Sequence, residues 1–106
     1  MKGKTEIKQS VYRQLKDVIG CKWSVSVLKN VANNVTRPGK LERHIAGISK
    51  KVLSERLRKL THYGLLAKQS YDERPPRTEY SLTESGKKLV SIIDQITTLD
   101  TQIKNK

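Results

Sequence analysis

The stretch that decides the fold is Ile48-Ser-Lys-Lys-Val-Leu-Ser-Glu-Arg-Leu-Arg-Lys-Leu-Thr-His-Tyr-Gly-Leu-Leu66. Its leucines at positions 53, 57 and 60 recur at helical spacing and predict an amphipathic helix over residues 49–63, with the leucines facing a core. Ser49 is suited to cap its start, because a serine hydroxyl accepts hydrogen bonds from the free N–H groups of the first turn. Gly64 is expected to end the helix, since glycine adopts the left-handed conformation at little cost.

The next residues are Ala67-Lys-Gln-Ser-Tyr-Asp-Glu-Arg-Pro-Pro-Arg-Thr-Glu-Tyr-Ser-Leu-Thr83, which predict a β-hairpin. Strands are expected at about 65–71 and 77–82, on either side of the turn Asp72-Glu-Arg-Pro-Pro-Arg77. Proline cannot donate to a sheet ladder, so both prolines belong in the turn, where they stiffen the backbone between its two arginines. A basic helix followed by a stiff basic hairpin is typical of a winged helix-turn-helix.

Helical spacing of apolar residues predicts four further helices, at about 7–19, 23–32, 40–46 and 84–104, the last capped by Thr83. In the second and third of these, the side chains expected to face inward are Trp23, Val27, Leu28, Val31, Leu41 and Ile45. The predicted fold class is mainly α with a small β-hairpin (α+β). It is a single winged-helix domain over residues 1–106, with the helix-turn-helix at 40–63 and the wing at 65–82.

The charge of the chain is strongly positive and unevenly distributed. The 106 residues contain 22 lysines and arginines against 10 acidic residues, a formal net charge of +12. Residues 37–77 hold 11 basic and 4 acidic residues, whereas residues 78–106 hold 4 of each. A field concentrated around one motif attracts polyanions, and duplex DNA is the partner that this motif suits.

The helix face opposite the three leucines carries polar side chains that can read base edges. Lys51 and Arg58 can donate to guanine O6 and N7, and Glu55 can accept from cytosine N4. Alternatively, Glu55 pairs with Lys51 or Lys59 across one helical turn. The N–H groups at the helix start favour a phosphate. The predicted recognition-helix contacts are Ser49, Lys50, Lys51, Ser54, Glu55 and Arg58.

Phosphate contacts on either side of a recognition helix fix its register on the duplex. In the wing, these contacts are predicted for Arg74 and Arg77, because an arginine on a stiff turn loses less entropy on reaching a phosphate or a narrow minor groove. Arg77 alternatively sits within the strand. Arg37 and Lys40, ahead of the recognition helix, are further candidates for phosphate contacts.

A set of short motifs spans about residues 18–93: Lys22-Trp23, Gly47-Ile48-Ser49-Lys-Lys-Val-Leu53, Arg56-Leu57, Leu60, Gly64-Leu65, Pro75-Pro76-Arg77, Glu79-Tyr80, Leu82-Thr83 and Gly86. By these residues the sequence resembles the HxlR-type branch of the MarR-like winged-helix transcription regulators. The resemblance implies a dimeric, bacterial-type DNA-binding regulator without enzymatic activity. Both repressors and activators occur in that family.

The apolar residues of the last helix recur at intervals of three and four, as in the seam of a packed helix pair. In one interpretation this helix packs only on its own domain. In the other, it forms a two-fold interface together with the first helix, which would place two recognition helices about one DNA turn apart on a pseudo-palindromic site. The predicted interface residues are Ile7, Val11, Leu15, Ile92, Ile96, Leu99 and Ile103, and Leu89 belongs to the same seam.

Cys21, the single cysteine, lies between Gly20 and Lys22 at the start of a predicted helix. A helix N-terminus and a neighbouring lysine both favour the reactive thiolate, which would allow redox or electrophile sensing. The alternative is a small buried apolar residue. The resemblance implies that sensing members carry their cysteine farther upstream in a Cys-Pro pair, which is absent here.

Other classes of function receive little support from the sequence. Cys21, His44 and His62 lack metal-ligand spacing, so no metal or cofactor is expected, and no nucleophile motif indicates an enzyme. No signal peptide or membrane-spanning run is visible, which favours a cytoplasmic protein. A winged-helix protein-interaction module without a DNA role stays open as the alternative function.

Overall fold

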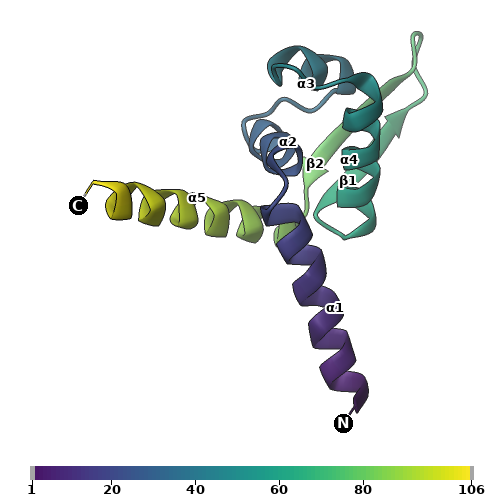
Figure 1. The fold of residues 1–106 in the computed structure, drawn as a ribbon. Coiled ribbons are helices and arrows are strands. Elements are labelled where there is room, and N and C mark those ends of the chain that lie inside the picture. The colour runs from purple at the N-terminus through teal and green to yellow at the C-terminus, as the bar shows by residue number, and fades with distance from the viewer. Residues whose placement is uncertain (1, 106) are drawn as a thin grey trace.

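The computed structural model describes the backbone of residues 2–105 and the side chains of residues 11–105. The elements follow the order α1 (Lys2–Ile19), α2 (Lys22–Ala32), α3 (Pro38–His44), α4 (Lys50–His62), β1 (Leu66–Tyr71), β2 (Arg77–Leu82) and α5 (Glu84–Lys104). The three central helices and the hairpin form one body, from which α1 and α5 extend in different directions (Figure 1). The predicted class, mainly α with a small hairpin, is confirmed.

Helix α4 has the ends that its sequence predicts. The Ser49 side chain accepts a hydrogen bond from the Val52 N–H at 3.1 Å. Gly64 has φ +77°, and its N–H donates to the Thr61 carbonyl at 3.0 Å, while the Leu65 N–H reaches back to the carbonyl of Leu60 at 3.0 Å. These two bonds form the Schellman arrangement, which requires a left-handed residue and therefore favours glycine.

Helix α3 differs from its prediction, because it begins at Pro38 and ends at His44 instead of covering 40–46. Proline is well suited to the first helical position, where its missing N–H would have had no partner. Ile45 is the C-cap, with extended backbone, and it stays buried together with Leu41. The sequence estimate placed the helix by its apolar spacing alone and missed this start signal.

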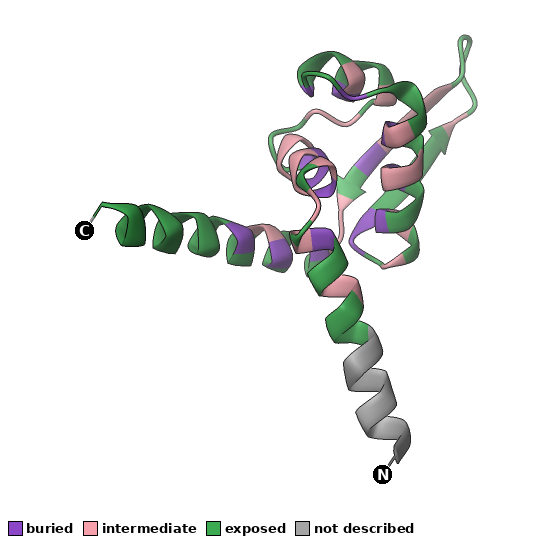
Figure 2. Ribbon diagram, viewed as in Figure 1, coloured by how far each residue is buried: buried purple, intermediate pink, exposed green. Residues whose placement is uncertain are grey.

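The core lies between α2, α3, α4, the hairpin and the near ends of α1 and α5 (Figure 2). Its fully buried residues include Val18, Val27, Leu28, Leu41, Leu60 and Leu66. Burying one such aliphatic side chain stabilises the fold by about 1.5–3 kcal/mol, compared with leaving it exposed. Trp23, expected to face the core, is only half-buried at its edge, where the Lys22 ammonium lies 4.6 Å from the ring centroid. Ser24 is the buried polar residue among the described side chains, and the sequence did not predict its burial.

The hairpin is antiparallel, with Leu66 opposite Leu82 and Tyr71 opposite Arg77. Its outer edge is covered at one point, where the Tyr80 N–H donates to the Thr36 carbonyl at 2.9 Å. The Tyr80 side chain is buried in the core. The wing is thereby attached to the connection between α2 and α3.

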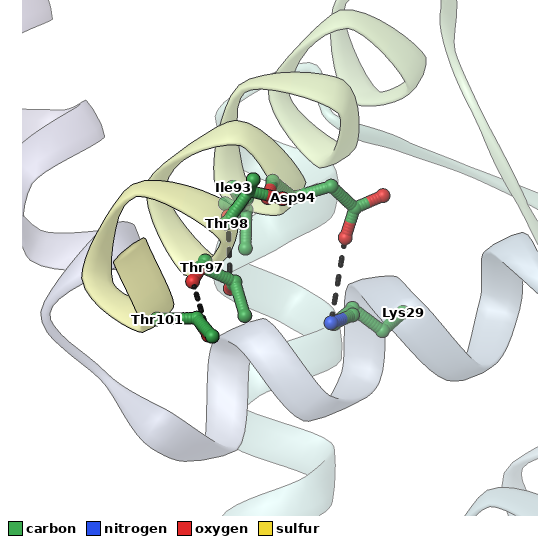
Figure 3. Close-up of polar contacts among 6 residues, drawn as sticks. All are labelled: Lys29, Ile93, Asp94, Thr97, Thr98 and Thr101. Carbon is green, nitrogen blue, oxygen red and sulfur yellow. Dashed lines mark hydrogen bonds and ion pairs between the residues drawn. The ribbon is translucent and has the colours of Figure 1, made fainter. Parts of the chain in front are cut away.

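Helix α5 begins at its predicted cap, since the Thr83 hydroxyl accepts from the Gly86 N–H at 3.0 Å. A salt bridge of 3.4 Å between Lys29 and Asp94 joins the helix to α2 (Figure 3). Beyond it, three threonine hydroxyls donate to carbonyls four residues earlier, from Thr97 to Ile93, Thr98 to Asp94 and Thr101 to Thr97.

Across residues 2–105, no helix has the length and apolarity needed to cross a membrane.

The apolar seam predicted for α5 divides into two parts. Leu89 is buried against the body, and so is Ile93, which the prediction omitted. The outer residues are exposed: Ile92 by 47%, Ile96 by 45%, Leu99 by 54% and Ile103 by 62%. The body covers only the first turns of α5, and the rest of the helix extends away from it (Figure 2).

Candidate nucleic-acid interface

The recognition residues predicted for α4 lie on its outer face. Ser49, Lys50, Lys51, Ser54 and Arg58 are exposed, and Glu55 is half-buried, whereas Leu53, Leu57 and Leu60 are buried on the opposite side. Within residues 11–105, no ion pair involves Lys51, Glu55 or Arg58. Lys59 pairs with Asp17 of α1 at 3.6 Å instead of with Glu55. This face is therefore polar, solvent-accessible and available to a ligand.

A groove of about 520 Å³ separates α4 from the hairpin. Three basic side chains line it, Arg58 and His62 from α4 and Lys68 from β1, and its lining includes no carboxylate. Lys68 is exposed and has no ion-pair partner among the described side chains. Sequence reasoning missed Lys68, because only the packing of the hairpin on α4 brings β1 beside the recognition helix.

The two predicted wing residues have different surroundings. Arg74 is exposed in the turn. Arg77 begins β2 and is held on several sides: its guanidinium lies 3.3 Å from the Glu73 carboxylate, 3.0 Å from that of Glu79 and 4.1 Å from the ring centroid of Tyr71. The Nε atom of Arg77 is buried, and its approach to Glu79 is an ion pair without hydrogen-bond alignment. Arg74 is thus the wing arginine that solvent and ligands reach more easily.

The two candidate phosphate contacts flank the start of α3. Arg37 is its N-cap residue, and its Nε lies 4.0 Å from Oε2 of Glu79. Lys40 is exposed in the first turn of the helix. A hollow of about 320 Å³ lies between Arg37 and the wing turn and includes Arg74 in its lining. The fold therefore places the basic residues of the α3 start and those of the wing on neighbouring surfaces.

Cys21 is half-buried at the N-cap of α2, where its side chain makes no capping hydrogen bond. Burial raises the pKa of the thiol, but the polar groups of Ser24, the backbone amide of Trp23 and the Arg56 guanidinium together lower it below its ordinary value. The charged group among them is the Arg56 guanidinium, which lies 3.8 Å from the sulfur. These surroundings favour the thiolate.

A second surface, apolar and separate from α4, lies along α1 and α5. It exposes Val11 by 49% and the unpredicted Tyr12 by 67%, together with the outer isoleucines and leucine of α5. Leu15 is half-buried against the core, and the side chain of Ile7 lies outside the described residues. A pocket of about 370 Å³ between the two helices includes Val11, Leu15 and Ile92.

Among the described residues, no group of three potential metal ligands comes together.

Comparison with known proteins agrees with this architecture. Residues 18–106 match the family described as HxlR-like helix-turn-helix. The uncharacterized HTH-type transcriptional regulator YkvN of Bacillus subtilis (strain 168) is 40% identical over 81 residues, which are 76% of this chain and 69% of YkvN. The matched stretch spans only 57–64% of three further curated relatives.

Two solved structures extend the similarity to the fold. A protein of Enterococcus faecalis V583 assigned to the MarR family of transcriptional regulators has a TM-score of 0.81 and 31% identity, covering 92% of this chain and 89% of its own. The redox regulator HypR in its oxidized form has a TM-score of 0.73 and 31% identity, covering 82% and 90%. The chain therefore belongs to the HxlR-like helix-turn-helix family of transcriptional regulators, which bind DNA and are not enzymes.

Proposed function

We propose that this protein is a sequence-specific, duplex-DNA-binding regulator of transcription that acts in the cytoplasm as a homodimer on a pseudo-palindromic operator. The observation that carries the proposal is the exposed outer face of α4, on which Lys51 and Arg58 have no ion-pair partner among the described side chains. A side chain that is already exposed and unpaired loses no internal interaction when it reaches a base edge.

The residues on and around α4 support two kinds of DNA contact, one with base edges and one with phosphates. Ser49, Lys50, Ser54 and Glu55 share the outer face with the two cations and are assigned to the major groove. Arg74 on the wing, and Arg37 and Lys40 at the neighbouring start of α3, would contact phosphates and set the register. Arg77 contributes through its charge and through the shape of the wing, because it is held by neighbouring carboxylates.

The homodimer is proposed from the apolar surface of α5 and α1. Ile92, Ile96, Leu99 and Ile103 are each exposed by 45% or more, and such a run on one helix is costly in water unless another apolar surface covers it. A second copy of the same helix would bury this run as a helix pair. Two copies related by a two-fold axis would present two α4 helices to one duplex.

The decisive experiment is a selection of genomic fragments by the purified protein, followed by titrations of the selected duplex at several salt concentrations. We expect a shared, pseudo-palindromic sequence and an affinity that falls steeply with salt. A protein that retains no duplex at low salt would instead be a winged-helix protein-interaction module, and the DNA proposal would be wrong.

A second candidate function, control of DNA binding by the oxidation of Cys21, is favoured by the lowered thiol pKa beside Arg56. Cys21 is the only cysteine of the sequence, so the available products are a disulfide between two subunits or a mixed disulfide with a small thiol. Operator titrations with and without a disulfide oxidant test this, with Cys21→Ser as the control. Equal oxidant effects on both proteins would exclude Cys21 as the sensor.

A further inference from the structure

The carboxylate of Glu79 joins the wing to the helix-turn-helix. Oε1 accepts a hydrogen bond from the Thr36 hydroxyl at 3.1 Å. Oε2 lies 3.0 Å from Nε of Arg77 and 4.0 Å from Nε of Arg37. The Glu79 side chain is 29% exposed, so these interactions are only partly screened by water. One carboxylate thus holds a residue of its own strand and two residues of the connection before α3.

The two residues of that connection are themselves part of the helix-turn-helix framework. The Thr36 carbonyl accepts from the N–H of Tyr80 at 2.9 Å, directly beside Glu79. Arg37 is the N-cap of α3, and its carbonyl accepts the first helical hydrogen bond, from Leu41, at 2.9 Å. The side-chain and backbone contacts therefore attach β2 to the first helix of the motif.

On its other side, the network extends toward the tip of the wing. Arg77, held by Glu79, also pairs with Glu73 at 3.3 Å and covers the ring of Tyr71. Glu73 and Arg77 are the residues that flank the exposed segment Arg74-Pro75-Pro76. The position of Arg74 relative to α3 and α4 thus depends on contacts that converge on Glu79.

We propose that Glu79 is a positioning residue for DNA binding, which fixes the wing and its Arg74 relative to the recognition helix. The proposal rests on the proposed function. A wing fixed in advance loses less entropy on reaching a phosphate, so the Glu79 contacts favour binding. Charge alone has the opposite effect, because a carboxylate near the interface repels DNA. The sign of the effect of neutralising Glu79 therefore separates positioning from charge.

The first test compares Glu79→Gln with Asp72→Asn in operator titrations at fixed salt. Both variants remove one negative charge from the hairpin, but Asp72 is exposed and has no ion pair among the described side chains. We expect Glu79→Gln to weaken binding about fivefold, as the loss of a partly screened ion-pair network predicts. Asp72→Asn should bind as tightly as the parent or more tightly. Tighter binding by both variants would overturn the proposal.

A second variant, Thr36→Val, removes the hydroxyl that donates to Glu79 without changing the charge. We expect it to weaken binding about twofold, as the loss of one partly buried hydrogen bond predicts. Because the valine side chain has a similar shape, this variant also serves if Glu79→Gln fails to fold. Parental affinity in Thr36→Val together with parental or tighter binding in Glu79→Gln would contradict the positioning role.

The last measurement needs no DNA. Amide hydrogen exchange at Tyr80 reports its bond to Thr36, and exchange at Leu65 reports the C-terminal cap of α4. In Glu79→Gln and Thr36→Val, the Tyr80 amide should exchange faster than in the parent, and the Leu65 amide should exchange at the parental rate. Unchanged exchange at Tyr80 would overturn the positioning role even if the parent binds an operator. If the variants exchange faster at Tyr80 but the parent binds no duplex, the role of Glu79 in attaching the wing stands and the proposed function is rejected.

Discussion

The carbonyl oxygen of Leu65 lies against the α-carbon of Gly86, in the space that a β-carbon would occupy. The same carbonyl accepts a hydrogen bond from the N–H of Thr83 at 3.1 Å, and the Thr83 hydroxyl donates to the carbonyl of Gly64. These contacts join the end of α4 to the start of α5. The direction in which α5 leaves the body, and hence the direction of its exposed apolar face, is set at this junction.

Gly86→Ala is expected to destabilise the protein by about 1–3 kcal/mol, because the added methyl group overlaps backbone that has little room to move. Urea unfolding measures the effect. Gly39→Ala is the matched control, since a β-carbon there meets nothing nearer than the Arg43 side chain at 4.0 Å. That control should be neutral or stabilising by up to about 1 kcal/mol, as for other helical glycines. Equal stability of the two variants would contradict the close packing at Gly86.

Lys51→Ala and Arg58→Ala should each weaken binding to the operator by about 1–3 kcal/mol and relax the preference for one base pair. The reason is that losing a base contact weakens binding to the operator sequence more than binding to a sequence in which that base pair is changed. Titrations of the operator and of single-base-pair variants at matched salt measure both effects. If both proteins bind and discriminate like the parent, α4 is not the recognition helix.

Lys68→Ala should weaken binding to all duplexes by a similar factor and reduce the magnitude of the salt slope by about 1, as expected for one lost phosphate contact. Its position in the groove between α4 and the hairpin is the basis for this expectation. Lys104→Ala removes the same charge near the far end of α5 and serves as the control. Equal salt slopes for the two variants would place Lys68 outside the interface.

Ile96→Asp should shift the protein from dimer to monomer, because it places a charge in the apolar run of α5. Sedimentation equilibrium at several protein concentrations measures the change. Thr98→Asp is the control on the same helix, where the residue is exposed and its hydroxyl bonds only to the backbone. A parent that is monomeric at all concentrations, or an Ile96→Asp variant that remains dimeric, would reject this surface as the interface.

The thiol of Cys21 should react with iodoacetamide with a pH midpoint below that of an ordinary cysteine, because its pKa is lowered and the thiolate is the reactive form. The thiolate fraction near neutral pH is then larger than for an ordinary cysteine. Arg56→Gln removes one cause of the shift, so the midpoint should move up and the reaction near neutral pH should slow. A midpoint that does not move in this variant would show that Arg56 does not act on the thiol.

The ends of α4 could be predicted because their causes are local. Ser49 and Gly64 act through hydrogen bonds and dihedral angles within a few residues, and the leucine spacing identifies the buried side. The seam of α5 was predicted only in part. Periodicity shows which residues share a face, but Leu89 is covered by the body and Ile96 is not, and this difference depends on where the helix leaves the body.

The candidate site divides in the same way. By itself, the sequence determined a basic helix, a stiff basic hairpin and their order, since charge, capping and proline content belong to adjacent residues. Only the tertiary structure decided which of the basic side chains are exposed and which are held. Arg77 meets Glu79 within its strand, but Thr36 and Arg37 reach Glu79 across more than 40 residues of chain. Such pairings depend on packing, which no local pattern encodes.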